Sequence, residues 1–477
     1  MSSSPTAQHC QDYARSHALA GAGLPTVEPG MPDPAGTGLT RRSMMLRSLG
    51  LGMAVYGAGA LGGADHVEAA INDALGEHKV VVSVFIDGGW DALSVLAPFG
   101  SDHRHEARLA ELRPGLSAID RGAASVFAAD PSLSWHPSAA GLRDLWDDPA
   151  IGVAVAPAIG YSSPNYSHFT SRHFWEVGAL DVGGTTGWMG RYLDRVGRGD
   201  VPIQGVTMGG SLSPALATSN VPVAAVYDID SYRYDYRGAA GRVAAAATNE
   251  LRALAAKASG DAQRDQARMV TGASFRLVDD MTAAATTTAS GVAYPADSSY
   301  FVDSLKDTAR LLGTRVAGSA LPIRCVALRG HGGYDTHSAQ EPNFSSNLRI
   351  TTQAIKAFWA DLTARGQQDR VAMLVWSEFG RRPAENGSAG CDHGAAGSAF
   401  VIGPSVRQGL IGEFPGLAGY GSAAAGLMRD GNLRATSDFR GVYSALLEQW
   451  LGTDAAGIIP GAGARPGSGA FARPTLF

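Results

Sequence analysis

The sequence predicts an α/β fold with a mostly parallel central sheet and helices on both faces. Two patterns favour this class. Continuous apolar runs rich in Val, Ile and Leu end in glycine-rich polar turns, and amphipathic or alanine-rich stretches of helical length separate the runs. Strands covered on both faces are apolar along their whole length, and their alternation with helices is typical of parallel sheets.

Each element follows from its own local pattern. Strands are expected at residues 80–86, 152–156, 321–328, 371–376 and 400–402, with short strands and turns within 201–230. Helices are expected at residues 136–147, 167–177, 299–315, 347–365 and 437–451, the last capped by Ser437. Loops are expected at residues 161–165 and 390–394. We expect a single domain over residues 78–477 with a helical insertion at about 238–320.

Composition restricts the classes of partner. The chain has 477 residues, of which 45% are hydrophobic and 17% are charged, and its net charge is −5. It lacks a basic tract, so nucleic acid and anionic membranes are not expected partners. The cysteines are Cys10, Cys325 and Cys391. They form no disulfide framework, although one bond between Cys325 and Cys391 stays open.

The N-terminal region predicts export. Arg41 and Arg42 precede an apolar, glycine-diluted stretch of about 13 residues, shorter than the ~20 that cross a membrane, and small residues follow it. Residues 39–70 are therefore expected to be a twin-arginine signal. It would be read by the twin-arginine export machinery, leave no membrane span after cleavage, and deliver the domain to the periplasm or the exterior. The alternative is a basic turn before a short core helix. Residues 1–38 are expected to be a disordered leader, with Met31 as an alternative start.

Acidic and histidine residues follow the ends of several predicted strands. In open α/β sheets, ligands bind at the carboxyl ends of the strands, so these side chains should converge. Mixed carboxylate and imidazole donors suit Zn, Mn or Fe better than Ca, and two bridged metals can act on an anionic ester. The expected cofactor is a divalent ion, Zn, Mn or Mg, in a site for one or two ions. For each residue alone, a turn or a helix cap is the alternative. The candidate ligands are Asp87, Asp91, Asp335, His337, Glu378, Asp392 and His393.

Further candidates lie near these ligands. Ser167 precedes a predicted helix, where it is either a nucleophile or a simple N-cap, and His168 is a base or a ligand. His331 would line the same edge. Arg381 or Arg382 would clamp an anionic substrate, unless it pairs with Glu385 on the surface. Three isolated histidines are expected to be surface or packing residues: His103, His105 and His173.

An ordered series of motifs resembles one bacterial family. The motifs are GGWD (88–91), NYSHF (165–169), GGYDTH (332–337), WSEFGRR (376–382), CDHG (391–394) and SDFRGVYSALLEQWLG (437–452). Over about residues 78–452 the chain resembles the uncharacterised DUF1501 family. That family is grouped with the alkaline phosphatase-like superfamily, so the resemblance implies an alkaline phosphatase-like α/β fold with two metals at the sheet edge.

The resemblance also implies which residues hold metal. The first-strand acid would be Asp91 or Asp87, the next pair Asp335 and His337, and the later ligands Glu378 and His393. The chain departs from the superfamily pattern where Ser377 and Glu378 stand in place of Asp-His. It also lacks the C/S-x-P-x-R setting of sulfatases, so sulfatase chemistry is not expected.

These observations predict an exported metal-dependent hydrolase that acts on phosphate or related anionic esters. The alternative is a catalytically degenerate envelope protein that binds a polymer or a protein partner. A redox protein is disfavoured because Gly88 and Gly89 lack the third glycine of a dinucleotide-binding turn.

Overall fold

The computed structural model describes residues 53–54, 78–99, 103–116, 125–234, 241–297, 299–463 and 471–477. The predicted leader lies outside these residues, as does the predicted signal apart from Met53–Ala54. Among the helices of this described part, none is long and apolar enough to cross a membrane.

A ten-stranded sheet forms the centre of the described chain. Its strands, in spatial order, are β1 (Met53–Ala54), β7 (Val223–Val226), β6 (Gly205–Met208), β10 (Cys325–Arg329), β2 (Val80–Phe85), β11 (Val371–Trp376), β14 (Gly397–Gly403), β5 (Gly152–Gly160) and β15 (Gly409–Leu410), with β16 (Ser437–Asp438) also paired to β5. The five strands from β7 to β11 are mutually parallel.

Strand β14 runs antiparallel to both of its neighbours. Parallel neighbours need a long crossover, usually a helix. The connection from β11 to β14 instead holds the hairpin of β12 (Gly380–Glu385) and β13 (Cys391–Gly394), so the chain returns antiparallel. The prediction of a mostly parallel α/β sheet is confirmed.

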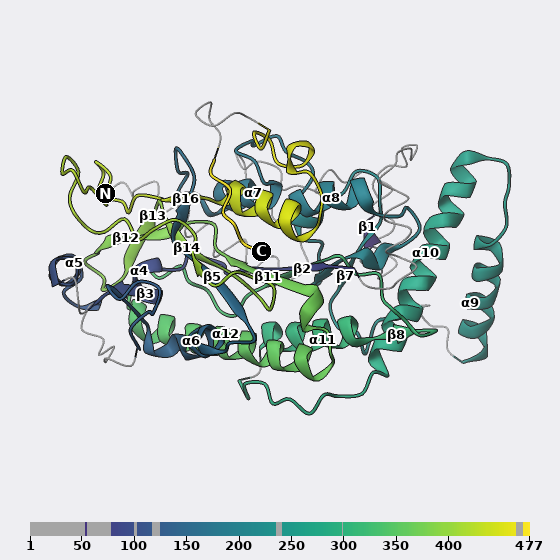
Figure 1. Cartoon of the computed structure of the whole chain (residues 1–477). Helices are drawn as coiled ribbons and strands as arrows, with labels where there is room; N and C mark the ends of the chain where they lie inside the picture. The colour runs from purple at the N-terminus through teal and green to yellow at the C-terminus, as the bar shows by residue number, and fades with distance from the viewer. Residues whose placement is uncertain are drawn as a thin grey trace.

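Helices cover both faces of this sheet (Figure 1). Helices α6 (Ala140–Asp147), α11 (Tyr300–Gly313) and α12 (Gln340–Ala364) lie on one face, and α7 (His168–Val177), α8 (Trp188–Val196) and α13 (Phe439–Ala445) lie on the other. Alternate residues of β2 enter the two cores: Val80 and Val82 pack with the first set, and Val81 and Phe85 with the second. This period of two explains why the strand is apolar throughout.

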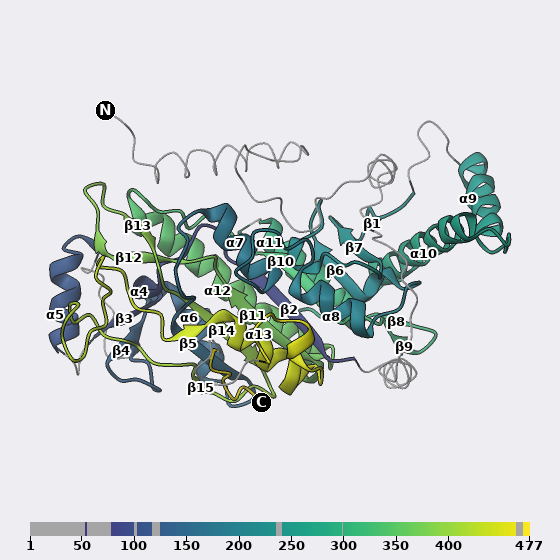
Figure 2. The same cartoon turned by 90° about the horizontal axis from the view of Figure 1, so that it is seen from above.

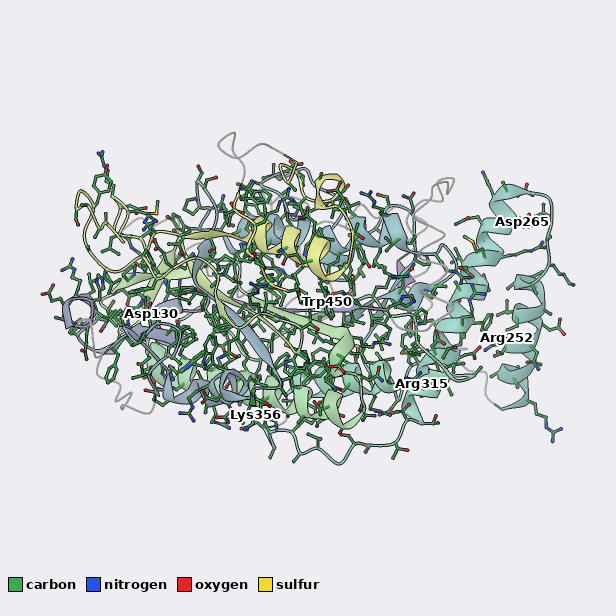
Figure 3. The ribbon with its side chains drawn as sticks, viewed as in Figure 1. Asp130, Arg252, Asp265, Arg315, Lys356 and Trp450 are labelled. Atoms are coloured by element: carbon green, nitrogen blue, oxygen red, sulfur yellow. The ribbon has the colours of Figure 1, made fainter. Side chains whose placement is uncertain are left out.

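Smaller elements extend this framework. They are α4 (Ala92–Val95), β3 (Leu96–Pro98), α5 (His103–Leu112), β4 (Leu133–Trp135), β8 (Arg315–Val316), β9 (Ser319–Ala320), α9 (Arg242–Ala255) and α10 (Ala262–Ala285). Helices α9 and α10 project from one end of the molecule (Figures 1 and 2), and Arg252 lies on the outer helix (Figure 3). Helix α9 buries none of its residues, whereas α11 packs in the main core.

Two local predictions are wrong. Residues 390–394, expected to be a loop, contain strand β13, which pairs with β12. The helix expected after Ser437 begins one residue later: Asp438 caps it by accepting from the Arg440 N–H, while Ser437 pairs with β5. Cys325 lies on β10 and Cys391 on β13, and both are buried free thiols, so the disulfide left open by the sequence is not formed.

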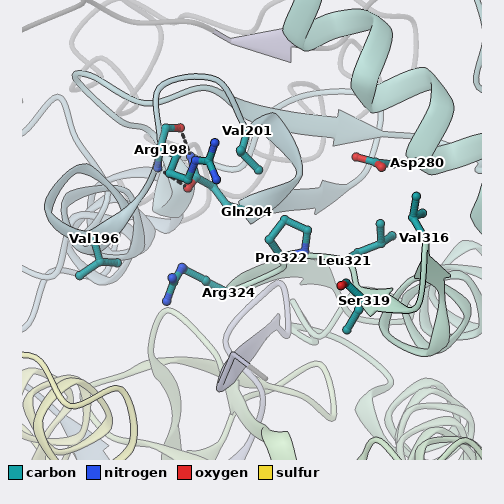
Figure 4. Close-up of a pocket in the computed structure, with 11 residues that line it drawn as sticks. Val196, Arg198, Val201, Gln204, Asp280, Val316, Ser319, Leu321, Pro322 and Arg324 are labelled. Atoms are coloured by element: carbon teal, nitrogen blue, oxygen red, sulfur yellow. Dashed lines mark hydrogen bonds between the residues drawn. The ribbon is translucent and has the colours of Figure 1, made fainter. Parts of the chain in front are cut away.

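A cavity of about 250 Å³ lies at the amino ends of β6 and β10, at the edge opposite the predicted site. Figure 4 shows Asp280 on one side of it and Arg198 and Arg324 on the other. Burial raises the pKa of Asp280 to about 7, Asp279 adds to the rise, and Arg276 opposes it.

The raised pKa of Asp280 predicts a pH-dependent stability. The folded state holds this proton more tightly than the unfolded state, whose pKa is near 3.8. The stabilisation from the proton is therefore complete below about pH 4 and is lost as the pH rises through about 7. We expect Asp280→Asn to unfold at higher denaturant concentration than wild type at pH 8. Denaturant titrations at pH 5 and pH 8 test this, with the exposed Asp303→Asn as control. An equal difference at both pH values would contradict it.

Candidate metal centre

Three histidines converge on one carboxylate at the carboxyl edge of the sheet. Asp335 follows β10, His168 opens α7, and His393 lies in β13. Asp335 Oδ1 lies 3.1 Å from His337 Nε2, 3.3 Å from His393 Nε2 and 3.5 Å from His168 Nε2. The Nε2 atoms of His337 and His393 are 3.0 Å apart. The ligand atoms of His168, Asp335 and His393 all lie within 4.8 Å of one another.

Each of these histidines is held through its other ring nitrogen. The Nδ1 partners are the Glu378 carboxylate for His168 (2.7 Å), the Asp392 carboxylate for His337 (3.1 Å) and the Tyr166 carbonyl oxygen for His393 (2.7 Å). Burial raises the pKa of both carboxyls, but their hydrogen bonds bring each pKa below its ordinary value, so they are ionised and accept. We therefore assign the proton to each Nδ1, which leaves every Nε2 with a lone pair facing the cluster.

Lone pairs and a carboxylate at these distances repel one another unless a cation offsets the repulsion. The Arg381 guanidinium, 2.7 Å from Asp335 Oδ1 and 3.3 Å from His337 Nε2, offsets part of it, and a metal ion bound by the imidazoles would offset the rest. Burial raises the pKa of Asp335, but its polar neighbours, among them the positive charge of Arg381, bring that pKa far below its usual range, so the carboxylate is ionised. Nitrogen and oxygen ligands about 2.1 Å from a zinc ion lie roughly 3.4 Å apart when tetrahedral. Asp335 Oδ1 lies 3.3 Å from His393 Nε2 and 3.5 Å from His168 Nε2, and these separations fit such an ion. The His168, Asp335 and His393 group can hold a metal, and its donor set suits Zn, Mn or Fe.

Arg381 fixes the carboxylate in place. Its guanidinium donates to Asp335 Oδ1 (2.7 Å), and to the carbonyl oxygens of Gly89 (2.8 Å) and Cys391 (3.1 Å). The side chain is fully buried. Arg381, predicted to clamp an anionic substrate, is in this structure a support of Asp335, and none of its side chain reaches solvent. Arg382 donates to the Asp430 carbonyl oxygen.

Ser377 and Glu378 tie the loop after β11 to the loop after β2. The Ser377 hydroxyl donates to the Ile86 carbonyl oxygen (2.6 Å) and accepts from the Trp90 N–H (3.1 Å). The Gly88 N–H donates to Glu378 Oε1 (2.9 Å). Glu378, predicted as a ligand, is instead the buried partner that orients His168.

Two other predicted ligands lie outside the cluster. The Asp91 carboxylate caps α4, forms a fully buried ion pair with Arg113 (3.0 Å to Nη2), and accepts from Gln340 (2.7 Å). Asp87 pairs with Arg329. Burial raises the pKa of Asp87 to about 6, Arg329 lowers it, and Glu378 raises it. Each carboxylate already has an arginine as its cation, and one metal-binding group is found among the described residues.

Ser167 and His331 do not touch the cluster through any hydrogen bond found among the described residues. The Ser167 hydroxyl caps α7 by accepting from the Thr170 N–H at 3.5 Å, which is the N-cap alternative. His331 is half-buried, and its neighbouring charges are Asp297 and Arg349. Burial lowers the pKa of His331.

Two glycines permit the close approach of these loops. Gly88 has φ of +104°, and a Cβ there would lie 2.5 Å from the Asp335 backbone nitrogen. Gly89 has φ of +69°, and a Cβ would lie 2.4 Å from the Phe379 ring, which packs on His168 and His393. A side chain at either position would push the strand-end loops apart.

Several residues of the site were not predicted from the sequence. They are Tyr166, whose carbonyl orients His393, Phe379, which packs on two histidines, and Arg113 and Arg329, which neutralise carboxylates. One pattern in the sequence indicates the orientation of two of the carboxylates. Phe85 and Trp376 are paired and face α7. Asp87 follows Phe85 by two positions and Glu378 follows Trp376 by two positions, so strand alternation points these side chains to the same side.

Comparison with known proteins identifies the family. The model of a family of proteins of unknown function, DUF1501, matches residues 78–457. The chain belongs to the DUF1501 family. No curated protein matches its sequence.

Three solved structures resemble the chain weakly. The lipoteichoic acid synthase LtaP from Listeria monocytogenes has a TM-score of 0.31 and 7% identity, covering 84% of this chain and 76% of that one. The phosphonate monoester hydrolase of Agrobacterium radiobacter has a TM-score of 0.32 and 11% identity, and the match covers 82% of this chain and 78% of that one. The PsFucS1 sulfatase from Pseudoalteromonas sp. has a TM-score of 0.31 and 10% identity, and the match covers 83% of this chain and 73% of that one.

The hydrogen bond between Glu378 and His168 is expected to raise the affinity of the centre for metal. Glu378→Gln keeps the shape of the side chain but removes the charge that fixes the His168 ring. We expect metal affinity to fall by about 10–100-fold, as measured by competition with a chromogenic chelator. Glu385→Gln is the control, because Glu385 accepts from the Gly115 and Leu116 N–H groups instead. Unchanged affinity in Glu378→Gln would refute the assigned role.

Proposed function

We propose that this DUF1501 protein is a metal-dependent hydrolase of phosphate or related anionic esters. One observation carries the proposal: the Nε2 atoms of His168, His337 and His393 face one carboxylate oxygen of Asp335, and each ring is bonded through Nδ1 to a partner on its far side. A divalent ion held there would act as a Lewis acid on an ester oxygen and would make water a stronger nucleophile.

The residues of the centre fall into two groups: direct metal ligands and residues that orient those ligands. His168, Asp335 and His393 would hold the ion, and His337 lies beside them, with its Nε2 atom 3.0 Å from His393 Nε2. Glu378, Asp392 and the Tyr166 carbonyl keep the rings in orientation, while Arg381 keeps Asp335 from turning away. Each role predicts a different loss on substitution: a variant of a direct ligand loses the bound metal, and a variant of a supporting residue binds the metal more weakly.

The direction of substrate entry follows from exposure. The side chains of His168 and Glu378 are fully buried, whereas His337 is 28% exposed and Asp392 is 51% exposed. Substrate would therefore approach over the β12–β13 hairpin, past His337. Ser167 stands beside His168 at the N-terminus of α7, where helix N–H groups favour an anion. The Ser167 hydroxyl accepts from the Thr170 N–H, and we propose that it donates its own proton to a substrate oxygen bound at this helix end.

We further propose that the protein acts after export. The motif around Arg41 and Arg42 supports delivery by the twin-arginine machinery to the periplasm or the exterior. A small anionic ester or an anionic envelope polymer is the proposed substrate at that location.

Metal analysis tests the centre. Protein purified with Zn, Mn and Mg available is expected to carry metal and to hydrolyse an aryl phosphate. Asp335→Ala and His393→Ala should lose the metal and more than about 100-fold of the activity, because each removes a direct ligand. His105→Ala is the control, since His105 accepts from the Leu417 N–H on another part of the surface. Wild-type protein without metal, or with metal but without turnover of phosphate or phosphonate esters, would overturn the proposal.

Cell fractionation tests export. Changing Arg41 and Arg42 together to Lys should retain the protein in the cytoplasm, because the twin-arginine route reads the arginine pair. Lysines keep the charge, so an effect of charge alone is controlled. Equal export of this variant and the wild type would argue against the route.

A further inference from the structure

Two arginines beside the metal centre have no part in holding it. Arg172 lies on α7 and Arg329 ends β10. Each is anchored by a buried carboxylate: Arg172 Nε lies 2.8 Å from Glu176 Oε1, and Arg329 pairs with Asp87. The carboxylate side chains are only 5% and 2% exposed, whereas the Arg172 and Arg329 side chains are 31% and 45% exposed. Solvent at this place therefore meets guanidinium groups and not carboxylates.

The two guanidinium groups lie on the same face of the sheet. Arg329 is directly paired with Phe85, so their side chains point to the same side, which is the side of α7. The Arg172 guanidinium lies over the Phe85 ring, 4.6 Å from its centroid. Burial lowers the pKa of Arg329, the Arg172 charge lowers it further, and Asp87 opposes both. Two like charges are thus held together above the end of β2.

This arginine pair, Arg172 and Arg329, adjoins the metal centre. Arg172 follows His168 by four residues, so the two share one face of α7 and are about 6 Å apart along its axis. On the sheet side, Asp87 precedes Gly88, whose N–H bonds the same Glu378 that holds His168. Asp87, which holds Arg329, and Glu378, which holds His168, are therefore linked through the backbone at Gly88.

We propose that Arg172 and Arg329 form an oxyanion subsite next to the metal centre. The inference rests on the proposed hydrolase and narrows its substrate class. The substrate would carry a second anionic group about one helical turn from the ester that reacts, as in a polyanionic chain. Paired guanidinium forks suit phosphate oxygens, and their buried carboxylates keep the forks in place before binding. Arg381 cannot perform this role, because it is fully buried.

Phosphate binding to metal-depleted protein tests the subsite separately from the hydrolase. Full-length protein treated with a chelator is titrated with inorganic phosphate by calorimetry. We expect saturable binding that weakens by about tenfold or more in Arg172→Gln and in Arg329→Gln, because each loses charge-assisted hydrogen bonds. Arg329→Lys should retain part of the affinity, since it keeps the charge. No saturable binding by the wild type, or wild-type affinity in either folded Gln variant, would overturn the subsite.

Arg252→Gln is a matched control. Arg252 lies over the Phe275 ring, 4.6 Å from its centroid, and pairs with Asp279, and its side chain is 40% exposed. It lies on the projecting α9 (Figure 3). Phosphate affinity should not change in this variant. Thermal unfolding of all variants shows whether a loss of binding reflects loss of fold; Arg329→Lys supplies the comparison if either Gln variant unfolds. Failure of turnover in metal-loaded protein would refute the hydrolase and leave this binding result intact.

Discussion

One buried guanidinium joins the loops that make the site. Arg381 comes from β12, yet it bonds the carbonyl oxygens after β2, a carbonyl in β13 and the Asp335 carboxylate after β10. A buried charge is costly without partners, and here carbonyl dipoles and one carboxylate supply them. The loops after β2 and β10, which are remote from Arg381 in sequence, must therefore close around it together with the neighbouring strand β13. The positions of Asp335 and His393 follow from that closure.

The sequence predicted the framework of the fold because apolar continuity is a local signal. Strand β11 was predicted to the residue, and the carboxyl-edge rule placed Asp335, His337 and Glu378 at one edge. The hairpin was harder. Glycines suggested a loop at 390–394, but these residues pair with β12. Strand alternation then separates Asp392, which is exposed, from His393, which is buried in the cluster.

Which carboxylates hold metal could not be decided from the sequence, because that depends on the partner each one finds. Asp91 and Asp335 both follow strands, but Asp91 meets the distant Arg113 and Asp335 meets three imidazoles. Asp87 forms an ion pair with Arg329. These choices are made by tertiary contacts over long sequence separations, and composition or spacing carries no trace of them.

The three histidines differ in what holds them. His168 and His337 depend on the carboxylates of Glu378 and Asp392, whereas His393 depends on the main-chain carbonyl of Tyr166. Every residue type has that carbonyl, so position 166 can drift in evolution without releasing His393, provided the backbone before α7 keeps its course. Positions 378 and 392 have no such freedom. The centre is thus robust to mutation on one side and fragile on the other two.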